Sequence, residues 1–125
     1  MIMDRIKTII VDDHQVFRGL LKKLLGRYPG IEVVAEAETA EESLRQASDL
    51  LPNLMTVDIN LPGMNGFELT RILKERYPRT RVIIISVNGN PAFQREAKDL
   101  HCPYVAKESL YADLPAALQR VMGGE

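Results

Sequence analysis

The stretch "IIVDDHQ", residues 9–15, places three apolar residues directly before two adjacent aspartates. It continues the run "IKTIIV" (6–11), whose β-branched residues are typical of a buried strand. Acidic residues usually lie on the solvated surface, yet Asp12 and Asp13 follow a strand that looks buried. The same step from an apolar run to a polar residue recurs along the chain, and it sets the expected fold.

Four more apolar runs predict strands, and helical patterns separate them. The further strands are expected over 31–37, 54–57, 81–86 and 103–106. In the segments between them, apolar residues recur three and four positions apart, which places them on one face of a helix. The helices are expected over 15–28, from Thr39 toward Pro52, over 67–77, over 93–100, and from Ser109 to Met122.

Capping and turn residues mark the ends of these elements. Thr39, with Glu42 three residues later, predicts a capping box, and Ser109 predicts the N-cap of the last helix. The turns are expected at "PG" (29–30), "NGNP" (88–91) and "GG" (123–124).

Five strands that alternate with five helices predict an α/β fold, a single doubly wound five-stranded parallel sheet with helices on both faces. "RVIIIS" (81–86) is the most apolar run and is therefore expected to be a central strand, buried on both faces. A chain of 125 residues fits one domain, over 1–125. Ligands of such sheets bind beyond the carboxyl ends of the strands, where the strand order reverses.

Composition excludes several classes of function. The 16 basic and 17 acidic residues leave a formal net charge of −1, which argues against a nucleic-acid surface on this chain. The single cysteine, Cys102, cannot form an internal disulfide, so a reducing cytoplasm is the expected location. No apolar run approaches the roughly 20 residues of a membrane span.

Polar residues follow four of the five predicted strands. Asp12 and Asp13 follow the first, Asp58 the third and Ser86 the fourth, while Lys107 follows the fifth. In a parallel sheet these ends share one edge, so three carboxylates, a hydroxyl and an ammonium group converge there.

Three carboxylates in one crevice repel one another, and a divalent cation relieves that repulsion. A few carboxylate oxygens, with water in the other positions, suit Mg²⁺. Lys107 offers the compact positive charge that holds a phosphate, and Ser86 can donate a hydrogen bond to a phosphoryl oxygen. Asp58 can attack phosphorus and become an acyl phosphate.

Taken in order, these motifs resemble the receiver domain of bacterial two-component response regulators, over nearly all of 5–122. "VDDH" (11–14) resembles the family's acidic pair, and "DINLPGMNG" (58–66) fits its D-x-x-[ML]-P-x-M-x-G pattern. Ser86, Tyr104 and Lys107 stand at its two switch positions and its lysine position. "VDDHQVFR" and "PGIEVVAEAETAEESL" are most similar to regulators of the LuxR/NarL type.

The resemblance implies a flavodoxin-like strand order, 2-1-3-4-5. It also implies that Asp58 is a phosphoacceptor, which receives its phosphoryl group from a sensor histidine kinase. It implies Mg²⁺, for which Mn²⁺ can substitute, held by Asp13, Asp58 and the backbone carbonyl of Asn60, with Asp12 acting through a water. The chain is then not an enzyme in the usual sense. It catalyses its own phosphorylation and a slow autodephosphorylation, with Lys107 and Ser86 assisting at the phosphoryl group.

The resemblance also implies a switch and its partners. Ser86 moves toward the phosphoryl group and Tyr104 turns inward, which alters the face formed by helix four, strand five and helix five. That face, or the surface of helices one and five, is the expected homodimer contact. DNA is reached only through a helix-turn-helix domain that this chain does not contain, and a stand-alone receiver is the alternative.

Other interpretations stay open. Asp12 and Asp13 alone would fit a solvated helix N-terminus, and Tyr104 would fit simple packing. A Mg²⁺-dependent aspartyl phosphatase would need a second acid two residues after Asp58, where Asn60 stands. The third alternative is a receiver fold that acts only as an unphosphorylated interaction module. His14 and His101 are not expected to bind metal.

Two positions depart from the family's pattern. The residues at 100–103, "LHCP", replace a glycine-containing loop, which puts the local backbone in doubt. Val87 stands where alanine is usual, and we expect its larger side chain to slow autodephosphorylation.

Overall fold

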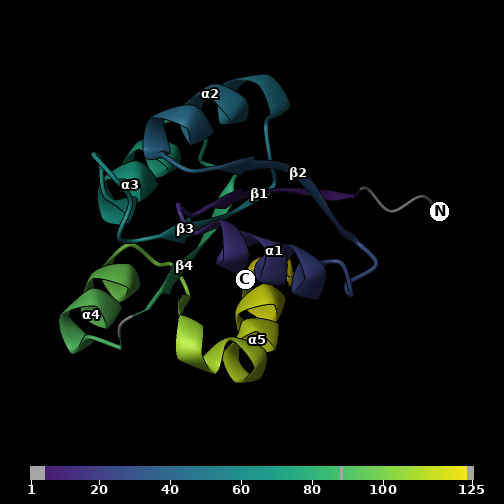
Figure 1. Cartoon of the computed structure of the whole chain (residues 1–125). Helices are drawn as coiled ribbons and strands as arrows, with labels where there is room; N and C mark the ends of the chain where they lie inside the picture. Colours follow the sequence, from purple (N-terminus) through teal and green to yellow (C-terminus); the bar gives the residue numbers. More distant parts are fainter. Residues whose placement is uncertain (1–4, 88, 124–125) are drawn as a thin grey trace.

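The computed structural model describes residues 5–87 and 89–123, whose path Figure 1 shows. The elements in chain order are β1 (Ile6–Val11), α1 (Gln15–Leu25), β2 (Ile31–Ala37), α2 (Ala40–Leu50), β3 (Leu54–Asp58), α3 (Gly66–Arg76), β4 (Arg81–Ser86), α4 (Pro91–Asp99), β5 (Tyr104–Ala106), the 3-10 turn η1 (Lys107–Ser109) and α5 (Leu110–Met122). Asn88 of the expected turn and Gly124 after the last helix lie outside the described residues.

The strands form one parallel sheet in the order β2-β1-β3-β4-β5, which confirms the predicted doubly wound α/β fold. The order reverses between β1 and β3, because β2 lies outside β1 whereas β4 and β5 continue beyond β3. Val11 of β1 pairs with Val57 of β3, so the residues that follow them leave the sheet side by side.

Two apolar cores lie on opposite faces of this sheet, and alternate strand residues supply them. Ile9 and Ile84 belong to the core beneath α2, α3 and α4, while Ile10 and Ile83 belong to the core beneath α1 and α5. Figure 1 shows α2 and α3 on one side of the sheet and α1 and α5 on the other. Burial on both faces explains why the central strands contain so few polar residues.

Several element boundaries differ from the prediction, and three of them have a clear physical cause. The helix α1 ends at Leu25 rather than Tyr28, because Gly26 caps it and the next residues turn away. β5 begins at Tyr104, since Pro103 has no backbone N–H to contribute to the ladder. Ser109 makes no side-chain cap, because it ends the 3-10 turn η1 that leads into α5.

The capping prediction for α2 is confirmed in part. The Thr39 hydroxyl accepts a hydrogen bond from the Glu42 backbone N–H at 3.1 Å. The Glu42 carboxylate, however, accepts from the backbone N–H of Glu38 instead of Thr39. The reciprocal capping box lies at α3, between Asn65 and Glu68, where the sequence suggested only a loop.

The loop before β5 replaces its missing glycines with one left-handed residue. His101 adopts φ 59°, and the carbonyl of Pro103 still accepts a hydrogen bond from Ile84 at 2.9 Å. The departure at 100–103 therefore leaves the connection to the sheet intact.

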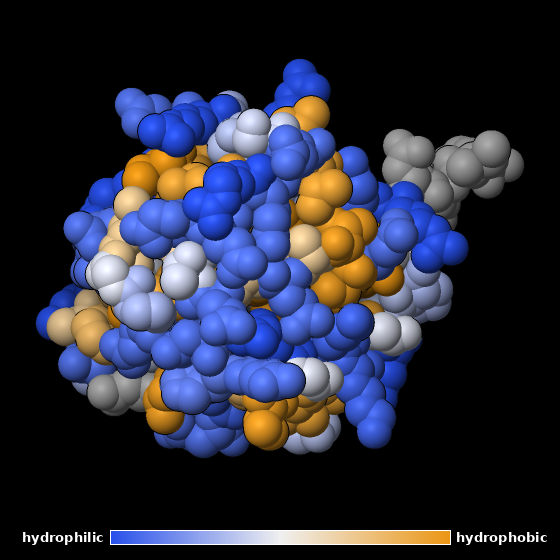
Figure 2. All heavy atoms as spheres, turned by 45° about the horizontal axis from the view of Figure 1, so that its top comes forward, coloured by the Kyte–Doolittle hydropathy of each residue, from blue (hydrophilic) through white to orange (hydrophobic). Residues whose placement is uncertain are grey.

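Hydrophilic side chains dominate the face seen in Figure 2, with smaller apolar areas between them. The large apolar side chains that are exposed include Val16 and Leu20 on α1 and Tyr111 on α5. Within 5–87 and 89–123, none of the helices has the length and apolar character needed to cross a membrane.

Candidate functional site

The register of the sheet brings the predicted polar residues to one edge. Asp12 follows Val11, whose partner Val57 directly precedes Asp58, so the two aspartates leave neighbouring strands together. Ser86 ends β4 and pairs with Ala106 of β5, the residue before Lys107. These residues lie where the strand order reverses, the position at which open parallel sheets bind ligands.

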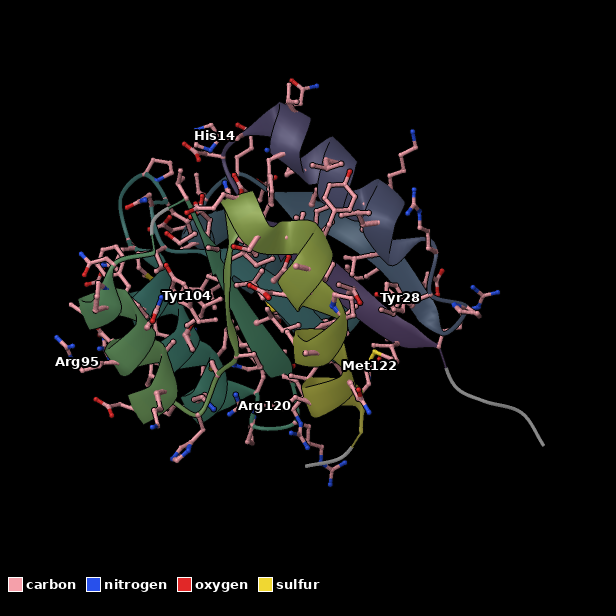
Figure 3. The ribbon with its side chains drawn as sticks, turned by 90° about the horizontal axis from the view of Figure 1, so that it is seen from below. His14, Tyr28, Arg95, Tyr104, Arg120 and Met122 are labelled. Atoms are coloured by element: carbon pink, nitrogen blue, oxygen red, sulfur yellow. The ribbon has the colours of Figure 1, made fainter. Side chains whose placement is uncertain are left out.

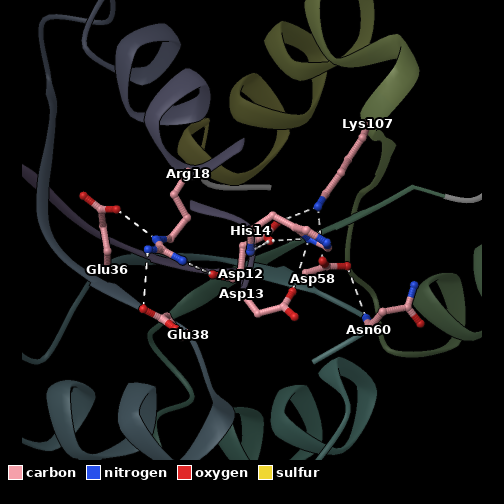
Figure 4. A network of polar contacts seen from close by, with 9 residues as sticks. All are labelled: Asp12, Asp13, His14, Arg18, Glu36, Glu38, Asp58, Asn60 and Lys107. Carbon is pink, nitrogen blue, oxygen red and sulfur yellow. Dashed lines mark hydrogen bonds and ion pairs between the residues drawn. The ribbon is translucent and has the colours of Figure 1, made fainter. Parts of the chain in front are cut away.

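Asp58 is a buried carboxylate that faces an ammonium group. Its residue is only 1% exposed, and Lys107 Nζ lies 3.2 Å from its Oδ2 atom (Figure 4). Burial and the nearby charge of Asp12 raise the pKa of Asp58, although Lys107 and the backbone N–H of Asn60 act in the opposite direction. The surroundings of Asp58 therefore disfavour its ionised form relative to a carboxyl in water.

Lys107 connects the two buried acids of the site. Its Nζ atom lies 2.7 Å from Asp12 Oδ2 and within salt-bridge distance of Asp58. The same atom stands 4.2 Å from the ring centre of Phe17, which adds a cation–π contact. The lysine side chain is thus held from three sides, and nothing in the sequence indicated the contact with Phe17.

Asp13 and His14 complete the cluster at the start of α1. The Nδ1 atom of His14 lies 3.2 Å from Asp13 Oδ1 and 3.3 Å from Asp12 Oδ1. One ligand atom from each of Asp12, Asp13, His14 and Asp58 falls within 4.8 Å of the others. We did not expect His14 to belong to this cluster. Its position directly after the acidic pair is the feature of the sequence that could have indicated it.

This donor set fits a hard divalent cation. Three carboxylates supply oxygen atoms, which Mg²⁺ prefers, and Asp13 keeps its side chain partly open to solvent. The burial that raises the pKa of Asp58 is the kind of destabilisation that such a cation offsets.

The loop after Asp58 is held close to the strand. The backbone N–H of Asn60 donates to Asp58 Oδ1 at 3.2 Å, and Gly66 donates to the carbonyl of Ile59 at 2.9 Å. A Cβ atom on Gly66 would stand 2.3 Å from the carbonyl oxygen of Asp58, so only glycine fits there. Gly66, the last residue of the "LPGMNG" loop, thereby fixes the backbone that carries the Asp58 carboxylate.

Ser86 and Tyr104 lie against each other in the structure. Ser86 is fully buried, whereas Tyr104 is half-buried beside the core beneath α4. Burial raises the pKa of the Tyr104 hydroxyl, and a side-chain hydrogen bond with Ser86 lowers it. The two predicted switch residues are therefore in direct contact. Figure 3 labels Tyr104 among the side chains.

A cavity lies elsewhere in the molecule. It has a volume of about 600 Å³ and opens at the amino-terminal end of β4, next to Arg79, Arg81 and Arg120. Figure 3 places Arg120 at the opposite end of the molecule from His14. None of the four residues of the acidic cluster lines this cavity.

Comparison with protein families assigns the chain to a family. Residues 8–119 match the response regulator receiver domain. The chain belongs to this family. The match spans both acids of the pair, Asp58, both switch positions and Lys107, so the resemblance inferred from the motifs is confirmed.

Individual relatives agree with this assignment. The nitrate/nitrite response regulator protein NarL of Escherichia coli (strain K12) is 34% identical over 122 residues, covering 94% of this chain and 55% of NarL. A LuxR-family two-component response regulator from Aurantimonas sp. SI85-9A1 has a TM-score of 0.89 at 32% identity, over 98% of this receiver and 88% of that chain.

The isolated receiver domain of RcsB from Salmonella enterica serovar Typhimurium was solved in the presence of the phosphomimetic BeF₃⁻. It has a TM-score of 0.90 at 27% identity, over 98% of this chain and 91% of that one. The chain spans about half the length of most of the curated relatives it matches, as the shares of 56% for GacA of Pseudomonas syringae and 55% for NarL show.

Proposed function

We propose that this receiver accepts a phosphoryl group on Asp58 in a Mg²⁺-dependent reaction, with a sensor histidine kinase as donor. The observation that carries the proposal is the buried Asp58 carboxylate, which faces Lys107 and lies beside Asp12 and Asp13. A carboxylate in this setting is a nucleophile with charge compensation already in place.

In the proposed step, an Asp58 oxygen attacks phosphorus and the bond from phosphorus to the donor's imidazole nitrogen breaks. The electron pair of that bond stays with the imidazole, and an acyl phosphate forms. A bound Mg²⁺ would supply charge neutralisation at the phosphoryl oxygens. Asp13, Asp58 and the carbonyl of Asn60 would hold it, with Asp12 acting through a water, while Lys107 would pair with the added charge.

Ser86 and Tyr104 form the proposed switch. Ser86 shares a hydrogen bond with Tyr104 in this structure. A phosphoryl oxygen on Asp58 would compete for that hydroxyl, and loss of the bond would free the tyrosine to change its packing against α4. A local change of charge would then alter the face formed by α4, β5 and α5.

The proposed output is transcription, through a DNA-binding domain outside this chain. The support is the similarity to NarL and to LuxR-family regulators together with the share of their length that this chain covers. Homodimers through the α4-β5-α5 face, or through α1 and α5, stay predictions of the same proposal.

The test is covalent labelling by acetyl phosphate, followed by intact-protein mass spectrometry with Mg²⁺ or with EDTA. We expect one phosphoryl group per chain with Mg²⁺, none with EDTA and none in Asp58→Asn. Asp49→Asn, an exposed acid on α2, is the matched control and should label as the wild type does.

Labelling of Asp58→Asn at the wild-type yield would overturn the phosphoacceptor assignment. Release of inorganic phosphate over many turnovers, without a stable adduct, would instead indicate the phosphatase alternative. Failure of the wild type to label at any Mg²⁺ concentration would leave only the interaction module.

A further inference from the structure

Arg18 is a buried charged residue that the predicted site does not use. It lies in the second turn of α1, and its side chain is 9% exposed, although arginine is rarely buried without a specific partner. No pattern in the sequence singles it out, because an arginine within an amphipathic helix usually faces solvent.

Two contacts account for the burial of this guanidinium. Its Nε atom donates to Glu36 Oε1 at 3.0 Å, and Nη1 donates to the backbone carbonyl of Asp12 at 2.6 Å (Figure 4). Glu38 lies further away, with Oε2 at 3.8 Å from Nη2. Arg18 therefore spans from the edge strand β2 to the loop that carries the acidic pair.

The carbonyl that Arg18 contacts belongs to the peptide bond between Asp12 and Asp13. The N–H of Asp12 donates to Ala37 at 2.9 Å, so both backbone polar groups of Asp12 have fixed partners. Rotation of that peptide plane would turn the Asp13 carboxylate away from Asp58. The guanidinium opposes this rotation, because its planar fork binds a carbonyl and a carboxylate at once.

We propose that Arg18 is a positioning residue for the acidic pair, with Glu36 locking its guanidinium, and that it sets the affinity of the site for its divalent cation. The inference rests on the proposed Mg²⁺-dependent function. Within the described part of the chain, Arg18 makes its hydrogen bonds and ion pairs to Asp12, Glu36 and Glu38 and none to Asp58 or Lys107, so it acts through the Asp12–Asp13 backbone.

The test measures Mg²⁺ affinity directly, by isothermal titration calorimetry and by backbone amide shifts during a Mg²⁺ titration. In Arg18→Met we expect the Mg²⁺ dissociation constant to rise roughly tenfold, the lower end of the effect of removing a group that orients metal ligands. Labelling by acetyl phosphate should return to the wild-type rate at saturating Mg²⁺. A purely structural role would not separate affinity from rate in this way.

Two further variants keep the test decisive if Arg18→Met does not fold. Arg18→Lys retains the charge but cannot bind carbonyl and carboxylate together, and Glu36→Gln loosens the guanidinium without a change of shape. Both should weaken Mg²⁺ binding, by less than Arg18→Met. The matched control is Arg71→Met, which removes the exposed ion pair to Glu96 between α3 and α4 and should leave Mg²⁺ binding unchanged.

Mg²⁺ dissociation constants within twofold of the wild type in the folded Arg18 and Glu36 variants would overturn the inference. A wild-type chain that binds no Mg²⁺ would instead overturn the proposed function on which it rests. The two failures are therefore distinguishable in one titration series.

Discussion

The two ends of the sheet carry opposite charges, and they hold them differently. At the carboxyl end, Asp12 and Asp58 are buried and contact Lys107 at 2.7 and 3.2 Å. At the amino end, Lys74 and Arg120 line an open cavity, and both occupy the last turns of helices. Cations at helix C-termini are favoured by the helix dipole and remain hydrated, so the cations at the amino end destabilise the native state very little.

The two ends differ in how much they destabilise the native state. Buried carboxylates beside each other raise the free energy of the native state, and only a partner charge offsets it. The solvated cations at the amino end need no partner charge to offset their burial. The acidic end should therefore respond strongly to substitution, cation and pH, while the basic end should respond weakly.

The largest effect is expected from Gly66→Ala, which disrupts the backbone at the acidic end. Its Cβ atom would lie 2.3 Å from the carbonyl oxygen of Asp58 and 2.8 Å from Ile59 Cα. Since backbone cannot yield as a flexible side chain does, we expect a loss of about 3 kcal/mol in the free energy of unfolding, the upper end of the usual range for overpacking. Urea denaturation followed by circular dichroism measures it.

The control for this substitution is Gly19→Ala in α1, where a Cβ atom would meet nothing within 4 Å. There the lost flexibility of the unfolded chain should stabilise the protein by roughly 0.5–1 kcal/mol. If both variants lost stability equally, the steric account of Gly66 would be wrong.

Lys107→Met should give the next largest effect, because it leaves Asp12 and Asp58 without their shared cation. In metal-free buffer at pH 7 we expect a loss of about 2 kcal/mol, below the range for fully buried pairs because water still reaches the site. Mg²⁺ should restore part of this stability. Lys74→Met, at the basic end, should change the free energy of unfolding by no more than about 0.5 kcal/mol.

Thermal melts with and without Mg²⁺ distinguish the two lysines. Equal losses at both ends, or a Lys107→Met protein that gains nothing from Mg²⁺, would contradict the proposed contrast.

The smallest effect concerns pH. Burial and Asp12 raise the pKa of Asp58 above its ordinary value of 3.8, so ionised Asp58 destabilises the metal-free native state. Asp58→Asn should therefore raise Tm at pH 7, and a gain of about 1 kcal/mol would correspond to about 4 °C. The gain should be complete above the native pKa, shrink as the pH falls toward 3.8, and vanish below 3.8, where both states are protonated.

Calorimetry across this range in EDTA measures the difference between the variant and the wild type. Glu75→Gln, an exposed acid on α3, serves as the control and should show no comparable pH-dependent gain. A Tm difference that persists unchanged at the acid limit would show that the ionisation of Asp58 is not its cause.

Several features could be predicted from the sequence because they are local or periodic. The five strands follow from runs of apolar residues, and their alternation with helices predicted the doubly wound sheet. Asp58 and Lys107 were predictable site residues, because each stands at the end of a strand whose direction is known once the sheet is parallel. The ends of α1 and β5 were not, since they depend on how Gly26 and Pro103 meet their neighbours.

The fold class and the set of polar residues at one sheet edge follow from the sequence, because hydrophobic periodicity sets which way each strand and helix faces. How those residues divide their contacts depends on the three-dimensional packing. Lys107 bridges two acids over Phe17, and Arg18 reaches from Glu36 to the Asp12 carbonyl. Most of these contacts join residues far apart in the chain, and even the contact between Arg18 and Asp12, six positions apart, follows from packing that no local pattern records.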